Sequence, residues 1–300
     1  MKHTISVTFM LVMLFFVAQV VGLLVTNGYI DHEATKETGK VMFVNLPYDI
    51  ERPPMDEKSS FVFIITAVII GTLLVLLLVK FKRTFLWKVW FFLAVVLCLS
   101  ISFSAFMNAY LAFVISILLA VYKIFRPNVI IHNLTEIFVY GGLAAIFVPV
   151  MNVFAVIMLL IFISIYDFIA VFKIKHMITM AKFQTDSKVF AGLLIPYKGA
   201  KSEVKSKKKV KGVSVVRTAI LGGGDIGFPL LFAGVVMKGL IIDNGFLFGF
   251  LKSLIIPVFT SFALLFLLTK GQKDKFYPAM PILSVGCLLG YAVVLLINLV

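Results

Sequence analysis

The sequence predicts an all-α polytopic membrane protein. Of its 300 residues, 61% are hydrophobic and only 14% are charged, and the mean hydropathy is +1.09. A soluble domain of this size cannot hide that much apolar surface from water. Apolar runs of about 20 residues, long enough to cross a hydrocarbon core ~30 Å thick, recur along the whole chain. We therefore expect a multi-pass protein of the cell membrane.

Nine transmembrane helices are predicted. The first follows Lys2, but it is longer than the apolar core of a signal peptide and no small-x-small cleavage pattern follows it, so we expect it to be retained. The boundary between the third and fourth helices depends only on a turn around Asn108. The predicted spans cover residues 5–25, 61–79, 89–107, 109–122, 129–148, 153–172, 218–237, 246–268 and 277–299.

The basic residues predict the orientation. Most of the 28 lysine and arginine residues fall in alternate polar segments, on the same side as the N-terminus. The positive-inside rule then places the N-terminus in the cytoplasm and the C-terminus outside the cell. The net charge of +14 follows from this topology, so nucleic acid is not an expected partner.

One integral fold of three parts is expected. Residues 1–172 form a six-helix part and residues 217–300 a three-helix part. Between them, residues 173–216 form a basic cytoplasmic loop that we expect to be mobile.

Only three acidic residues lie within the predicted spans: Glu136, Asp167 and Asp225. An ionisable group at membrane depth is costly and usually has a task. Asp167 precedes Lys173 by six residues and Asp225 follows Arg217 by eight, which in helices gives depths of ~9 and ~12 Å from one boundary. The two acids are therefore at nearly equal depth, and on consecutive antiparallel helices they can face each other. Glu136 is expected to anchor its helix end rather than to join a polar network.

Two facing carboxyl groups would have a defined chemistry. In a low-dielectric site they cannot easily both ionise, so the pair holds one proton. The charged member can take a proton from water while the neutral member polarises a peptide carbonyl, which hydrolyses an amide without a metal. The four histidines form no HExxH motif and no GxSxG motif occurs. No metal and no cofactor are therefore expected.

Two further stretches loosen the backbone near these acids. Gly222–Gly224 lie within the seventh predicted helix, where each glycine costs ~1 kcal/mol of helix stability, and Pro229 should kink that helix. Residues 277–281 contain two prolines, which favour an extended conformation before the ninth helix. This stretch could shape a site or hold a substrate as an added strand.

These residues resemble the presenilin and signal peptide peptidase family of intramembrane GxGD aspartyl proteases, and most of all an archaeal presenilin homologue. The resemblance implies that Asp167 and Asp225 are catalytic, and that the loop between helices six and seven corresponds to the segment where presenilin is cut during maturation. It also implies that neighbouring residues shape the active site and bind substrate. They belong to the YD motif (Tyr166), the GxGD motif (Gly222, Gly224) and the PAL motif (Pro278, Ala279 and Met280, with methionine in place of leucine).

The function expected from the resemblance is aspartic endopeptidase activity on transmembrane segments of membrane-protein substrates. Two alternatives stay open at this point. A prepilin or preflagellin peptidase also uses a GxGD aspartate, and a proton-coupled transporter or channel also uses paired membrane acids, although no inverted repeat is visible. The expected partners are transmembrane helices and the lipid bilayer, and homo-oligomerisation is left open.

Overall fold

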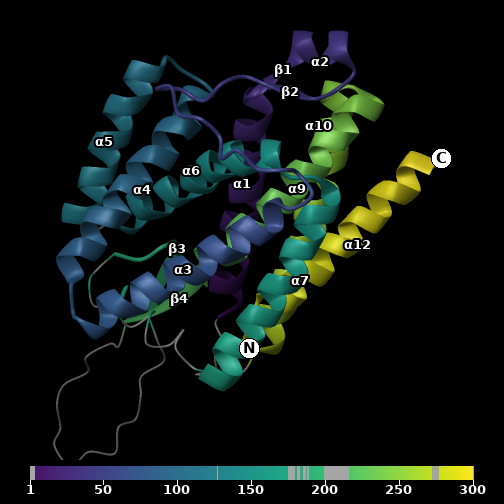
Figure 1. Ribbon diagram of the computed structural model, residues 1–300. Coiled ribbons are helices and arrows are strands. Elements are labelled where there is room, and N and C mark those ends of the chain that lie inside the picture. Colours follow the sequence, from purple (N-terminus) through teal and green to yellow (C-terminus); the bar gives the residue numbers. More distant parts are fainter. Residues whose placement is uncertain are drawn as a thin grey trace, which may run out of the picture.

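The computed structural model describes residues 4–126, 128–174, 180, 183–184, 187, 189–198, 216–271 and 277–299. Within these ranges, eight helical segments are long and apolar enough to cross a membrane (Figure 1). The protein is a mostly helical, multi-pass membrane protein, as predicted. The helices are α1 (Ile5–Gly28), α3 (Ser60–Lys80), α4 (Thr84–Ser104), α5 (Ala109–Phe125), α6 (Val129–Phe147), α7 (Val153–Ile169), α9 (Gly223–Asn244), α10 (Phe246–Ser253), α11 (Ile255–Lys270) and α12 (Met280–Leu299).

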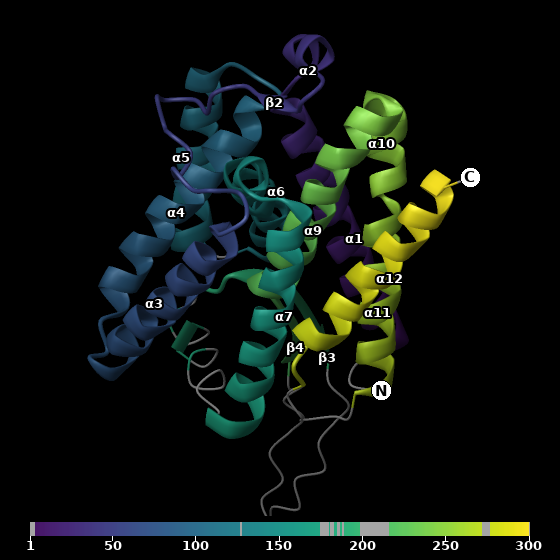
Figure 2. The ribbon, with the colours of Figure 1, turned by 45° about the vertical axis from the view of Figure 1, so that its right-hand side comes forward.

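The fourth predicted span corresponds to α5, which is apolar but has only 17 residues. At 1.5 Å per residue it is about 26 Å long, a little less than a typical hydrocarbon core. The eighth predicted span is divided between α10 and α11, which follow each other directly. The nine-span layout and the orientation therefore stay predictions. The start of α1 and the end of α12 lie toward opposite ends of the bundle (Figure 2).

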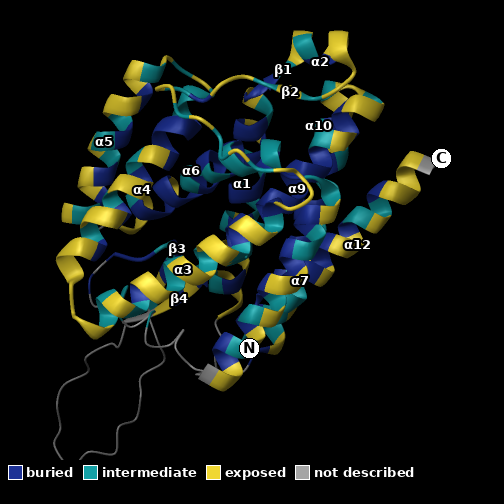
Figure 3. Ribbon diagram, in the orientation of Figure 1, coloured by how far each residue is buried: buried dark blue, intermediate teal, exposed yellow. Residues whose placement is uncertain are grey.

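The core of the bundle is built around α9. In the most apolar 18-residue stretch of α9, 72% of the residues are buried, against 11% in the corresponding stretch of α3. Among the eight long helical segments, α9 is therefore the most enclosed and α3 the most peripheral. α9 packs on α1, α6, α7 and α12, whereas α3 packs on α7 and α4. Figure 3 shows the buried residues gathered on these central helices and the exposed ones on the outer faces. Exposed apolar side chains on the outside are expected where the solvent is lipid.

Short elements close the ends of the bundle. At one end, β1 (Ile30–Asp31) pairs with β2 (Met42–Phe43), and α2 (His32–Thr38) lies between them. A 3-10 turn, η1 (Val148–Val150), joins α6 to α7, and α7 ends in a π-helical turn, η2 (Ala170–Ile174).

An antiparallel hairpin corrects the all-α prediction. β3 (Gly192–Lys198) pairs with β4 (Val216–Gly222), with Gly192 opposite Gly222. β3 lies in the segment expected to be a mobile loop, most of which is outside the described residues. β4 replaces the start of the seventh predicted span, so the helix begins at Gly223 and not at 218.

The hairpin has the period-two burial of a strand with one covered face. Ala219 and Leu221 are buried while Thr218 and Ile220 are exposed. β3 and β4 both contact α1, and β3 also lies along α6. Part of the hairpin is therefore packed into the helix bundle.

Candidate active site

Asp167 lies near the end of α7 and is only 5% exposed. Its carboxylate oxygen Oδ2 accepts a hydrogen bond from the backbone N–H of Met280, at 3.1 Å. Met280 is the first residue of α12, where backbone N–H groups have no partner within the helix. The side chain of Asp167 thus caps α12, and the charge is favoured by the helix dipole. The structure brings Asp167 together with the Pro278–Met280 segment.

A second bond joins α7 to α12 one turn away. The hydroxyl groups of Ser164 and Ser284 lie 2.8 Å apart. Pro278 and Ala279, which precede α12, are buried and not helical. The two bonds fix the start of α12 against the end of α7.

Asp225 lies in the first turn of α9, directly after β4. Gly222 precedes the helix in an extended conformation, and a Cβ atom built on it would lie 3.3 Å from Oδ2 of Asp225. The carboxylate therefore folds back over the strand end. α9 packs on α7, and α12 packs on both. The three helices that carry the three motifs are mutual neighbours, while the apposition of the two carboxyl groups stays a prediction.

The strand changes the depth estimate for Asp225. The predicted offset of ~12 Å from Arg217 assumed a helix. With a strand up to Gly222 and a helix after it, the same eight residues span about 21 Å. The aspartate therefore lies farther from Arg217 along the chain than predicted.

The three glycines do not interrupt a helix, contrary to the prediction. They form the junction between β4 and α9, where Gly223 lies against Tyr140 of α6. A Cβ atom on Gly223 would lie 2.7 Å from the hydroxyl oxygen of Tyr140, which is too close. A Cβ atom on Gly224 would meet only the Phe228 ring, at an ordinary 3.4 Å, and Gly224 is exposed. Packing therefore restricts Gly223, the middle residue of the motif, more than Gly224.

Tyr166 is partly buried and its hydroxyl donates to Oγ1 of Thr72 on α3, at 3.0 Å. This bond ties α7 to the peripheral helix α3. The side chain thus connects the residue next to Asp167 with the outer part of the bundle, a contact that the motif alone does not indicate.

Glu136 on α6 is the centre of a polar network, which corrects the prediction that it only anchors its helix. It is 1% exposed and forms an ion pair with Lys123 of α5, itself 4% exposed. It also accepts hydrogen bonds from the hydroxyl of Tyr140 and, at 2.9 Å, from the backbone N–H of Gly192. Lys123 donates a further bond to Thr135. A buried charge needs such partners.

Two more side chains of α6 hold the edge of β3. His132 Nε2 lies 2.7 Å from the carbonyl oxygen of Gly192. The Asn133 side chain donates to the carbonyl oxygen of Leu194 and accepts from its N–H, at 2.7 and 2.9 Å. Together with Glu136, these side chains bond the backbone groups of Gly192 and Leu194 that a neighbouring strand would otherwise bond. Sequence reasoning missed this role, although three polar residues within five positions of an apolar helix were a usable signal.

Metal ligation has no support from this geometry. Across the described part of the chain, no three His, Cys, Asp or Glu side chains are grouped closely enough to hold a metal ion. The absence of a cofactor stays a prediction.

Comparison with known families decides the class of protein. Residues 12–300 match the family described as signal-peptide peptidase, presenilin aspartyl protease. The chain belongs to this family. It is an intramembrane aspartic endopeptidase and a multi-pass membrane protein, so the predicted family, enzyme class and location are confirmed.

Solved structures agree on the fold. The chain resembles a presenilin family intramembrane aspartate protease in space group C222, with a TM-score of 0.60 and 16% identity over 97% of this chain and 99% of the other. A structure of such a protease in space group P2 gives a TM-score of 0.57 and 16% identity, with 96% of each chain covered. Comparison with curated protein sequences gives no match.

The glycine junction of this presenilin-family protease allows a direct test. Gly223→Ala should destabilise the protein by about 1–3 kcal/mol, because the added methyl group collides with the Tyr140 hydroxyl that Glu136 holds in place. Gly224→Ala is the matched control and should leave stability unchanged or slightly raised. Thermal unfolding in detergent measures both. Equal stability of the two variants would contradict the packing argument.

Proposed function

We propose that Asp167 and Asp225 are the catalytic pair with which this protease hydrolyses peptide bonds in transmembrane segments of membrane proteins. The observation that carries the proposal is the convergence of three motifs. Asp167 of α7 is bonded to Met280 at the start of α12, and α9, which carries Asp225 in its first turn, packs on both α7 and α12. Tyr166, Gly222, Gly224 and the Pro278–Met280 segment are proposed to shape the surrounding site.

The chemistry requires one proton shared by the two carboxyl groups. The ionised carboxylate takes a proton from water, and the water oxygen attacks the peptide carbonyl carbon. The protonated carboxyl group donates a hydrogen bond to the carbonyl oxygen, on which negative charge develops. A proton then passes to the peptide nitrogen, the C–N bond breaks, and an acid and an amine leave.

The substrate helix must unwind before it can react, because a closed helix satisfies its own backbone groups. The hairpin offers replacement partners. The N–H of Gly223 bonds to the carbonyl of Ala191, and α6 occupies the N–H groups of Gly192 and Leu194. In an antiparallel pair, the backbone N–H and C=O groups of alternate residues point toward the partner strand. Because the N–H of Gly223 points toward β3, the backbone groups of Leu221 and Ala219 also point toward β3.

The other edge of β4 is therefore open. There the backbone groups of Thr218 and Ile220 point away from β3, and they have no hydrogen-bond partner in the described part of the chain. We propose that an unwound substrate segment pairs with this edge as an added strand, next to Asp225.

A proline scan of β4 tests substrate pairing. Thr218→Pro removes an N–H that faces outward, so cleavage should fall about fivefold in kcat/KM while the fold is kept. Thr218→Ala keeps the N–H and should cleave at the wild-type rate. Ala219→Pro removes an N–H that faces β3 and should destabilise the protein instead. Full activity of Thr218→Pro would remove this edge from the substrate path.

The catalytic assignment is tested with purified protein in lipid vesicles and a single-span model substrate. Cleavage within the span, and its inhibition by a hydroxyl-containing transition-state mimic, are the expected results. Processing of a leader peptide only would favour a prepilin-type activity. Ion flux without cleavage would favour a transporter or channel.

A further inference from the structure

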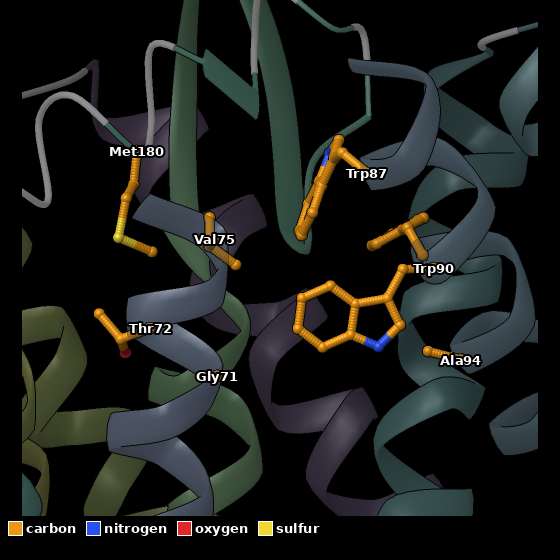
Figure 4. Close-up of a pocket in the computed structure, with 8 residues that line it drawn as sticks. Gly71, Thr72, Val75, Trp87, Trp90, Ala94 and Met180 are labelled. Atoms are coloured by element: carbon orange, nitrogen blue, oxygen red, sulfur yellow. The ribbon is translucent and has the colours of Figure 1, made fainter. Parts of the chain in front are cut away.

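A groove lies between α3 and α4 on the outside of the bundle, with a volume of about 330 Å³ (Figure 4). Its walls are largely apolar. α3 contributes Gly71, Thr72 and Val75, α4 contributes Trp87 and Trp90, and Met180 lies at one end. In Figure 4 the indole ring of Trp90 extends into the space between the two helices.

The groove exists because α3 is loosely packed and lacks a side chain at one position. A Cβ atom on Gly71 would meet nothing within 4 Å. Trp90 is 40% exposed, whereas Trp87 is 6% exposed and its indole N–H bonds to the carbonyl of Val189 at 3.3 Å. The groove therefore opens outward, to the face that lipid covers in a membrane.

A basic turn joins α3 to α4, the two helices that form this groove. Residues 60–104 contain no acid but carry Lys80, Lys82, Arg83 and Lys88. The first three are exposed, and none of the four forms an ion pair with another described residue. At 1.5 Å per residue, Gly71 lies about 14 Å along α3 from Lys80. The groove thus begins about 8 Å along α3 from this positive turn, at Val75, and extends to hydrocarbon depth at Gly71.

We propose that this groove binds an anionic phospholipid. The phosphate and the negative headgroup pair with the basic turn, and one acyl chain fills the space lined by Gly71 and Trp90. Each basic residue at a membrane surface favours anionic over neutral lipid, and tryptophan is typical of the level where headgroup and chain meet. A soluble anion would satisfy the turn but leave the apolar walls empty.

The site is connected to the proposed catalytic region by one bond. Thr72 lines the groove and accepts the hydroxyl hydrogen of Tyr166, which precedes Asp167. A bound acyl chain thus lies against the helix that supports this part of α7. The lipid site does not depend on the proposed chemistry, since its lining comes from α3, α4 and Met180 and includes neither aspartate.

The fluorescence of the protein reports this site directly. The chain has two tryptophans, Trp87 and Trp90, and both line the groove. The full chain is reconstituted in phosphatidylcholine vesicles. One of two lipids with brominated acyl chains, which quench tryptophan fluorescence, is then included at increasing fractions: brominated phosphatidylglycerol or brominated phosphatidylcholine. Brominated phosphatidylglycerol should reach half-maximal quenching at a roughly tenfold lower mole fraction. Equal quenching by the two lipids would overturn the proposal.

Two variants separate the headgroup from the chain. The triple variant Lys80→Gln, Lys82→Gln, Arg83→Gln should lose the preference for the anionic lipid, while Lys173→Gln with Lys270→Gln, exposed bases outside the turn, should keep it. A preference that survives the triple variant would overturn the headgroup assignment.

A Cβ atom at Gly71 has open space around it, so Gly71→Leu should place its side chain in the groove and reduce maximal quenching by either lipid, while it raises helix propensity. Ile70→Phe, at an exposed neighbouring position, is the matched control and should not reduce it. Unchanged quenching in Gly71→Leu would overturn the acyl-chain assignment.

Discussion

Asp167→Asn and Asp225→Asn should each reduce the cleavage rate of a transmembrane substrate by about 10⁴-fold or more, to background. Asparagine keeps the size of the side chain but can neither take a proton from water nor share one with its partner. Residues that act as one unit are strongly non-additive, so the double variant should be no slower than either single variant. The measurement is the initial rate in reconstituted vesicles under saturating substrate.

The matched control is Asp243→Asn. Asp243 lies on the same helix as Asp225 but near its opposite end, and it is exposed. Its loss should leave the rate unchanged. If either catalytic variant kept a tenth of the wild-type activity while folded, the assignment of a catalytic pair would be wrong.

Glu136→Ala should destabilise the protein by about 3–5 kcal/mol, because it leaves the charge of Lys123 buried without its partner. The N–H of Gly192 also loses its acceptor, so the hairpin before α9 should loosen and cleavage should be lost. Both cysteines, Cys98 and Cys287, are buried. A thiol-reactive fluorophore added during heating therefore reports unfolding.

A double variant separates the ion pair from the support of the hairpin. Lys123→Met with Glu136→Met removes both charges, so most of the lost stability should return. Methionine gives Gly192 no adequate acceptor, so activity should stay low. Full recovery of both stability and activity would show that Glu136 serves only to neutralise Lys123.

Much of this molecule follows from hydropathy. Asp167 and Asp225 were found because a charge within an apolar run is rare, and the helices because their apolar runs are long. The strand β4 was missed because the part of it inside the predicted span, residues 218–222, is short and largely apolar and continues into an apolar helix. Periodicity cannot separate a strand from a buried helix over so few residues.

The network around Glu136 was missed for a different reason. Lys123 counted as one of many bases at a membrane boundary, and it lies 13 positions before Glu136 in the chain. Its pairing depends on how α5 packs against α6, and the contact with Gly192 depends on a hairpin that sequence patterns did not reveal. Both require the tertiary structure.

The open edge of β4 also bears on how the reaction obtains its water. Backbone groups that lack a partner cannot stay in hydrocarbon, because each costs several kcal/mol there. With no substrate present, the outward N–H and C=O groups of Thr218 and Ile220 must be hydrated. A row of hydrogen-bonded water molecules along this strand would extend from the aqueous phase to the first turn of α9. The surface proposed to receive the substrate would then deliver the nucleophile before the substrate arrives and displaces it.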